Sequence, residues 1–173
     1  LLGNAIANHV AGMIGVKDAQ ECVSDDIMTD VFQPDERSRI MSLIQGKNTK
    51  PERIVRSIVH RLGYRFRLHR RDLPGTPDLV LPKLRSVIFV HGCFWHMHSC
   101  HKGRRTPVTN RKFWQEKRSA NASRDRRAVR RLRRAGWRVL VVWECQLRDV
   151  DAIAKKLQMF LRSGKPPKDS DRK

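Results

Sequence analysis

The sequence predicts an α/β protein in which helices flank a mixed central sheet. Short β-branched and aromatic runs at 86–90 and 137–143 have the composition of buried strands. Apolar residues recur at helical spacing over 54–62 and 149–161. The expected order is helix, three strands, helix, strand, helix, which is typical of a sheet that carries helices on its faces.

The first helix of this domain is expected to begin at a capping box, with Thr49 as N-cap and Glu52 at the third helical position. It ends at Gly63, and a shorter helix over 34–44 precedes it. The three strands expected next, separated by turns, are 64–68, 78–81 and 86–90.

The C-terminal half contains a long helical pattern from Asn110 to Ala135. Seven arginines lie between Arg124 and Arg134. Residues on one helix point in different directions, so only some of these arginines can face the same partner. The strand and the helix that complete the domain are 137–143 and 149–161.

Composition and charge divide the chain into three parts. We expect a flexible or irregular extension over 1–27, one domain over 28–162 and a disordered polar tail over 163–173. The formal net charge is +20, and residues 1–33 contribute −4 (one Lys and five acidic residues), so the remainder carries +24. Such charge favours nucleic acid or an anionic membrane surface as the partner. No apolar run reaches the ~18 residues that span a bilayer, which excludes a transmembrane protein.

The stretch from His91 to His101 holds four histidines, two cysteines and an aromatic pair. Buried imidazoles and thiols need partners, so this stretch is either a loop with satisfied core histidines or a metal site. The spacing Cys-x4-His-x-Cys offers three ligands to a tetrahedral zinc ion, and a cysteine after the neighbouring strand offers the fourth. The ligands expected are Cys93, His98, Cys100 and Cys145. The alternative is a disulfide with spare thiols, which a reducing compartment disfavours.

A fully ligated zinc ion has no open position, so catalysis must come from its neighbours. Pro77-Asp78 before a strand resembles the core of the PD-(D/E)xK, restriction-endonuclease-like nucleases, in which a sheet presents an Asp and a Glu-x-Lys to divalent metal ions. The Glu-x-Lys is missing here, so the available acid–base groups are His91 and His96. Mg2+ would then use Asp78, phosphate oxygens, waters and a backbone carbonyl such as that of Val90.

Further short motifs are distributed between about residues 28 and 161. They are Gly46–Glu52, Gly63–Arg67, Leu73–Asp78, Val90–His96, Phe113-Trp114, Asn121, Arg124-Asp125 and Gly136–Cys145. Together they resemble the very short patch repair (Vsr) endonucleases. The resemblance implies a prokaryotic, cytoplasmic enzyme of the nucleoid that nicks DNA 5′ to the thymine of a T:G mismatch. Such mismatches arise when 5-methylcytosine deaminates.

The resemblance also implies roles for five residues. Asp78 is the Mg2+ ligand, His96 the general base, and His91 contacts the phosphate or a metal-bound water. Glu52 matches a catalytic-region glutamate, although its place in a capping box explains it equally well. Asp125 matches an acidic residue that orients His91, or it is an ordinary helix-surface carboxylate. The zinc ligands implied are the four named above.

Aromatic and basic side chains are expected to contact the DNA. Phe94 and Trp95, with Trp114, resemble a wedge that enters the major groove beside the mismatch, and Met41 resembles a residue inserted from the opposite groove. Packing on apolar helix faces is the alternative for Trp114 and Met41. The expected DNA contacts are Met41, Lys47, Phe94, Trp95, Trp114 and Arg124.

The leading hypothesis is therefore a Mg2+-dependent mismatch endonuclease with a structural zinc ion. Its partner would be double-stranded DNA containing a T:G mismatch, together with mismatch-repair proteins. A monomer is expected, because an asymmetric mismatch has no two-fold symmetry to match. The alternatives are a non-catalytic zinc-stabilised DNA-binding protein and a related nuclease with a different DNA target.

Overall fold

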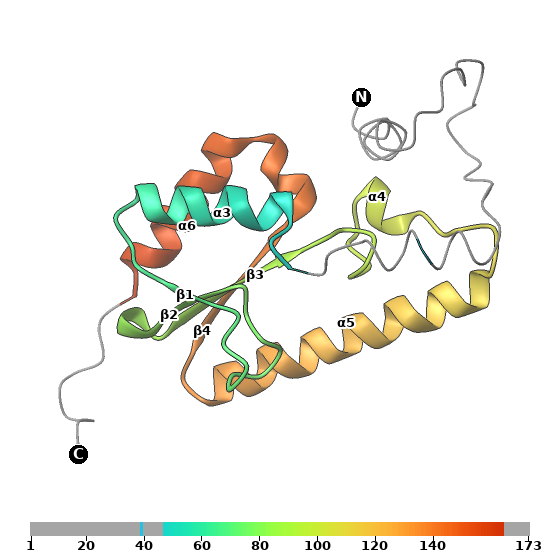
Figure 1. The fold of residues 1–173 in the computed structure, drawn as a ribbon, viewed down its shortest axis with the longest axis horizontal. Helices are drawn as coiled ribbons and strands as arrows, with labels where there is room; N and C mark the ends of the chain where they lie inside the picture. Colours follow the sequence, from blue (N-terminus) through green and yellow to red (C-terminus); the bar gives the residue numbers. More distant parts are fainter. Residues whose placement is uncertain (1–38, 40–46, 165–173) are drawn as a thin grey trace.

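The computed structural model describes Arg39 and residues 47–164 (Figure 1). The expected extension over 1–27, Met41 and residues 165–173 of the expected tail lie outside the described residues. Within the described part, no helix is long and apolar enough to cross a membrane.

The sheet is mixed, as expected, and has four strands in the order β1-β2-β3-β4. The first two pairings are antiparallel, whereas β3 and β4 are parallel. The strands are β1 (Arg67–Leu68), β2 (Leu79–Leu81), β3 (Ser86–His91) and β4 (Arg138–Trp143). The strand expected over 64–68 is only two residues long, because β1 pairs only with Val80 and Leu79 of the short β2.

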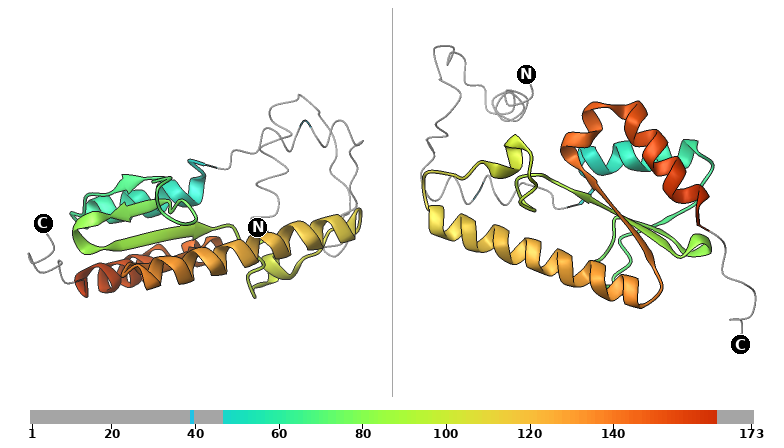
Figure 2. Two further views of the ribbon diagram at one scale, coloured as in Figure 1. Left: turned by 90° about the horizontal axis from the view of Figure 1, so that it is seen from below. Right: turned by 180° about the vertical axis from the view of Figure 1, so that it is seen from behind.

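Helices cover both faces of the sheet. On one face lie α3 (Lys50–Arg61) and α6 (Val150–Arg162), and on the other lies α5 (Arg111–Arg134) (Figures 1 and 2). Side chains of β3 alternate accordingly, since Ile88 packs in the core with α3 and α6 while Val87 and Phe89 pack in the core with α5. The fold is a three-layer α/β domain.

The helix boundaries follow from local sequence. Thr49 caps α3, with the Glu52 N–H donating to Thr49 Oγ1 at 3.4 Å and the Thr49 N–H donating to Glu52 Oε1 at 3.3 Å, so the predicted capping box is confirmed. The 24 residues of α5 match the expected helix and extend over about 36 Å. Its C-terminal half packs on the sheet through Ala128 and Leu132.

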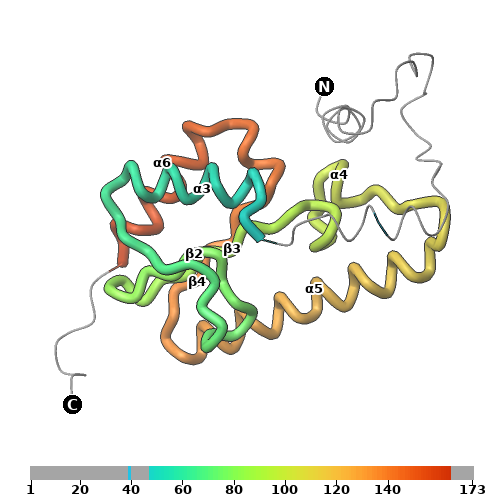
Figure 3. Tube along the Cα trace, in the orientation of Figure 1, coloured from blue at the N-terminus to red at the C-terminus, as the bar shows by residue number. Residues whose placement is uncertain are grey.

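The N-terminal half of α5 extends past the sheet (Figure 3). There it lies beside the loop that follows β3 and beside the short helix α4 (His101–Arg104). In the parallel ladder of β3 and β4, His91 pairs with Trp143. Cys93 and Cys145 therefore stand two residues beyond the same point of the sheet, as the sequence predicted for strands that end side by side.

Candidate active site

Three cysteines and one histidine converge where β3 and β4 end. The ligand atoms of Cys93, His98, Cys100 and Cys145 all lie within 4.8 Å of one another. Cys145 Sγ and His98 Nδ1 are 3.5 Å apart, and these two ligands would be roughly 3.6 Å apart around one tetrahedral zinc ion. The residues therefore fit a zinc ion. The three thiols are free, so the disulfide that the sequence left open does not form among the described cysteines.

The loop conformation depends on Gly103 of α4. A Cβ there would lie 2.0 Å from the carbonyl oxygen of His98, so only glycine fits this close approach. The Gly103 backbone also faces the cluster of three cysteines and His98. Burial opposes ionisation of the Cys100 thiol, but hydrogen bonds from His98 and the Gly103 N–H lower its pKa to about 6. A thiolate at this position is the form that binds metal.

Asp78 stands immediately before β2, beside the third strand. Its Oδ2 accepts a hydrogen bond of 2.7 Å from the Val90 N–H, so the two predicted Mg2+ contacts are neighbours. The side chain is 18% exposed. Burial raises the pKa of Asp78 to about 6, and the Glu52 carboxylate adds to this, whereas the Val90 N–H, Arg56 and His96 oppose it.

His91 and His96 are stacked, with ring centroids 4.0 Å apart and planes 7° from parallel. Asp125 from α5 lies 2.5 Å from His96 Nδ1. The motifs predicted that Asp125 orients His91. The structure places its carboxylate in hydrogen-bonding contact with His96, and the ligand atoms of all three residues lie within 4.8 Å of one another. The bond leaves His96 Nε2 available for acid–base chemistry. Burial, with His96 nearby, lowers the pKa of His91 to about 4, so this ring is neutral at physiological pH.

The His96–Asp125 pair opens into a cavity of about 320 Å³. The turn before Asp78 forms one wall through Gly75 and Thr76. Gly75 has φ +77°, and its Cα is so close to Ala128 of α5 that a Cβ would lie 2.6 Å from that side chain. The cavity is lined by Gly75, Thr76, His96, Asn121, Arg124, Asp125 and Ala128.

Glu52 lies near Asp78, but its carboxylate is already bound. It is 3% exposed, and Arg56 Nη2 donates to its Oε2 at 2.6 Å. His69 lies between Glu52 and Asp78, with ring nitrogens 3.6 Å and 3.8 Å from the two carboxylates. No local sequence pattern singled it out. The three side chains form a second group whose ligand atoms lie within 4.8 Å.

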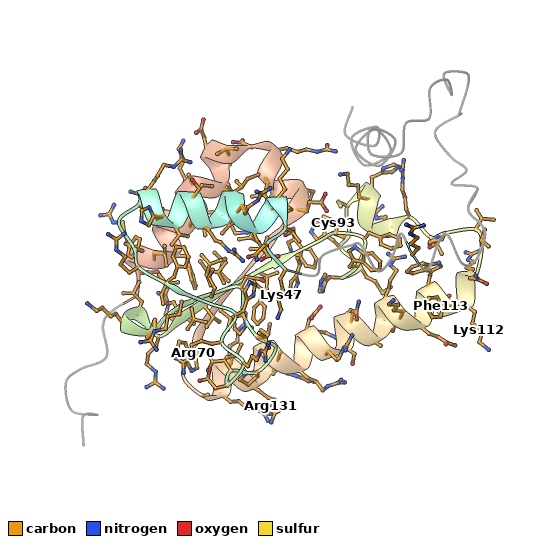
Figure 4. All side chains as sticks on the ribbon, viewed as in Figure 1. Lys47, Arg70, Cys93, Lys112, Phe113 and Arg131 are labelled. Atoms are coloured by element: carbon orange, nitrogen blue, oxygen red, sulfur yellow. The ribbon has the colours of Figure 1, made fainter. Side chains whose placement is uncertain are left out.

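The predicted aromatic wedge forms one cluster. Ring centroids of Phe94 and Trp95 are 5.1 Å apart, and those of Trp95 and Trp114 are 5.8 Å apart. Trp114 is 7% exposed, so it packs beneath the other two rings, as the alternative explanation expected. Phe113 is 55% exposed at the far end of α5 (Figure 4).

A buried arginine that the sequence did not reveal holds this loop. Arg118 of α5 is 3% exposed and donates to the carbonyl oxygens of Phe94 and Arg105 at 2.8 Å each, and to that of Gly103. Its guanidinium lies 4.5 Å from the centre of the Phe94 ring. Asn121 Nδ2 donates to the Trp95 carbonyl oxygen at 3.3 Å. The long helix therefore fixes the backbone of the aromatic pair and of the segment that follows it.

Lys47 and Arg124, the two basic residues among the predicted DNA contacts, are exposed, and Figure 4 labels Lys47 just before α3. The role of each in DNA binding stays a prediction.

These features define a class of protein: an α/β domain that presents histidine, cysteine and acidic side chains able to bind metal at the end of two parallel strands, as metal-assisted hydrolases do. The family model for DNA mismatch endonuclease Vsr matches residues 29–102. The DNA mismatch endonuclease Vsr of Escherichia coli (strain K12) is 46% identical over 121 residues, which cover 70% of this chain and 77% of that protein. The chain belongs to the Vsr family of DNA mismatch endonucleases, as the motifs predicted.

Other similar proteins are named as nicking enzymes. The Type II nicking enzyme V.XorIIP of Xanthomonas oryzae pv. oryzae is 50% identical over 134 residues, which cover 78% of this chain and 98% of that protein. Among solved structures, the Homing Endonuclease I-Bth0305I Catalytic Domain is 25% identical, covers 65% of this chain and 94% of its own, and has a TM-score of 0.47.

Proposed function

We propose that this Vsr-family endonuclease nicks one strand of DNA 5′ to the thymine of a T:G mismatch and so initiates very short patch repair. The observation that carries the proposal is the His96–Asp125 pair, 2.5 Å apart, close enough to Asp78 for His96 to influence its pKa. The names of the relatives, a mismatch endonuclease and a nicking enzyme, support this activity. We also propose that the domain has the restriction-endonuclease-like fold.

His96 acts as the general base. Asp125 holds its Nδ1, so Nε2 is the nitrogen that accepts the proton of a water molecule whose oxygen attacks the scissile phosphorus. The bond from phosphorus to the leaving oxygen breaks, and this oxygen takes a proton from solvent. His91, neutral and stacked under His96, supports the base and contacts the phosphate.

Asp78 is the protein's ligand for Mg2+. Mg2+ keeps several waters and binds substrate oxygens, so it needs few ligands from the protein. One carboxylate and one backbone carbonyl fit this requirement. N–H and C=O of one strand residue point to the same edge, so the Val90 carbonyl oxygen faces the same side as the N–H that donates to Asp78. When bound, Mg2+ supplies electrostatic stabilisation of the charge that develops on the phosphate.

A structural zinc ion braces the loop that carries the base and the wedge. Cys93, His98, Cys100 and Cys145 ligate it with no open position, so it takes no part in the chemistry. The loop presents Phe94 and Trp95 to the DNA, supported by Trp114. A T:G pair is easier to distort than a matched pair, so insertion of the rings contributes specificity.

Contacts to the DNA backbone come from Lys47 and Arg124, and Met41 enters the opposite groove. We expect a monomer acting on chromosomal DNA in the cytoplasm, because a mismatch offers no two-fold axis. Glu52 supports the site through its neighbours and not as a catalytic group.

Cleavage of a panel of duplexes tests this function. Zinc-loaded protein with Mg2+ is given matched A:T and G:C duplexes and T:G and A:C mismatches, with each strand labelled separately. The proposal expects a nick only in the thymine strand of the T:G duplex. Cleavage of matched duplexes would favour a nuclease with another target, and tight binding without cleavage would favour a DNA-binding protein.

A further inference from the structure

His69 is a partly buried titratable residue that the proposed chemistry does not use, and it lies between the two carboxylates of the site. Its Nε2 is 3.6 Å from Glu52 Oε2, and its Nδ1 is 3.8 Å from Asp78 Oδ1. Arg56 Nη2 lies 2.9 Å from the same Nε2. Glu52 and Arg56, one turn apart on α3, and His69 from the segment after it therefore connect α3 to the proposed metal ligand.

Glu52 cannot serve as a second metal ligand, because hydrogen bonds occupy both of its oxygens. Oε2 accepts from the Asn48 N–H at 3.0 Å and from Arg56 Nη2 at 2.6 Å. Oε1 accepts from the N–H and the hydroxyl of Thr49, at 3.3 Å and 2.9 Å. The Arg56 guanidinium takes the position that a cation would need between Glu52 and His69. The buried glutamate anchors Arg56.

The guanidinium fixes the tautomer of His69. Arginine has five donors and no acceptor, so His69 Nε2 must be the acceptor of the 2.9 Å contact with Arg56. The ring proton then resides on Nδ1, the nitrogen that faces Asp78.

We infer that His69 is a positioning residue for Asp78: anchored by Glu52 through Arg56, it directs its Nδ1–H at Oδ1 while the Val90 N–H holds Oδ2. Both carboxylate oxygens then have a defined orientation before a divalent cation binds, as outer-shell partners of metal ligands provide. The 3.8 Å contact is longer than a hydrogen bond, as such contacts often are before ligand binding. This inference rests on the proposed role of Asp78 as the metal ligand.

The backbone at His69 offers a matched pair of variants. Its φ is +45°, a conformation that glycine and asparagine tolerate better than other residues. His69→Asn keeps a donor, since Asn Nδ2 occupies the place of the imidazole Nδ1, whereas His69→Gly removes it. The two variants differ in the donor and not in backbone strain. Thermal unfolding of both, without added divalent cation, checks that each is folded.

Mn2+ binding measured by electron paramagnetic resonance tests the inference without DNA. Zinc content is held equal, and Asp78→Asn identifies the binding that depends on Asp78. We expect His69→Gly to weaken this binding about 10-fold or more and His69→Asn to stay within about twofold of the wild type.

Three results would overturn the inference: wild-type affinity in His69→Gly, equal weakening in both variants, or no Asp78-dependent Mn2+ binding in the wild type. The proposed function fails separately. A wild-type protein that shows the expected Mn2+ pattern and nicks no T:G duplex refutes the mismatch activity and leaves the role of His69 intact.

Discussion

Replacing Asp78 with asparagine is expected to stabilise the Mg2+-free protein while it abolishes nicking. Asp78 is 18% exposed, and burial raises its pKa from the ordinary 3.8 to about 6. Asparagine has no charge to bury, and its Oδ1 can still accept the hydrogen bond that the Val90 N–H gives to Asp78. The buried Asp78 carboxylate therefore lowers the stability of the fold, and its charge is what the proposed Mg2+ ion would bind.

The sign and size of this change in the free energy of unfolding follow from proton linkage. Because the folded-state pKa lies above the unfolded one, the carboxyl contributes stability that is fully present below pH 3.8 and is lost as the pH rises through about 6. A shift of about 2 units corresponds to about 3 kcal/mol. Asp78→Asn should thus gain about 2–3 kcal/mol near pH 8, and the gain should halve by about pH 5.

Urea unfolding of zinc-loaded protein without Mg2+, at about pH 5 and about pH 8, measures this difference. Asp151→Asn is the control for net charge, because Asp151 is an exposed carboxylate in the first turn of α6 and should give no gain. Saturating Mg2+ should reduce the difference in stability between Asp78→Asn and the wild type, since Mg2+ binds only the wild-type carboxylate. No gain in stability, or a gain that is the same at both pH values, would refute the reasoning.

Three further variants test other parts of the site. Asp125→Asn should slow single-turnover nicking about 10²–10⁴-fold with little change in DNA binding, because His96 loses its orienting carboxylate; an unchanged rate would remove Asp125 from the mechanism. Cys145→Ser should abolish stoichiometric zinc, measured by metal analysis of the purified protein, and full zinc occupancy would contradict the Cys3His site. Arg118→Met should lower the free energy of unfolding by about 2–4 kcal/mol, because three carbonyl oxygens lose their donor. Urea denaturation measures this loss, and wild-type stability would show that the loop does not depend on Arg118.

Local sequence predicted much of this architecture. The capping box at Thr49, the length of α5 and the parallel ends of β3 and β4 depend on neighbouring residues or on strand composition. The Cys3His cluster was predictable for the same reason, since Cys93 and Cys145 each follow one of two adjacent parallel strands.

Contacts across the layers could not be predicted in this way. His91 ends β3 and His96 lies five residues further on in the loop, and only the position of α5 decides that Asp125 contacts His96. Arg118 looks like one more exposed arginine of a basic helix until the loop folds over it. His69 lies in a short connection, and its position between the carboxylates depends on the pairing of β1 with β2.

Strand-resolved nicking of a T:G duplex by the wild type and by His96→Ala, with and without Mg2+, tests the central claim most directly. His101→Ala is the matched control, because His101 is an exposed histidine of the same segment outside the groups of converging ligands. The account predicts that the wild type and His101→Ala cut only the thymine strand, only with Mg2+, and that His96→Ala is at least about 10²-fold slower. Equal rates for His96→Ala and the wild type would contradict the assignment of the base, and tight binding by all three proteins without any cleavage would contradict catalysis itself.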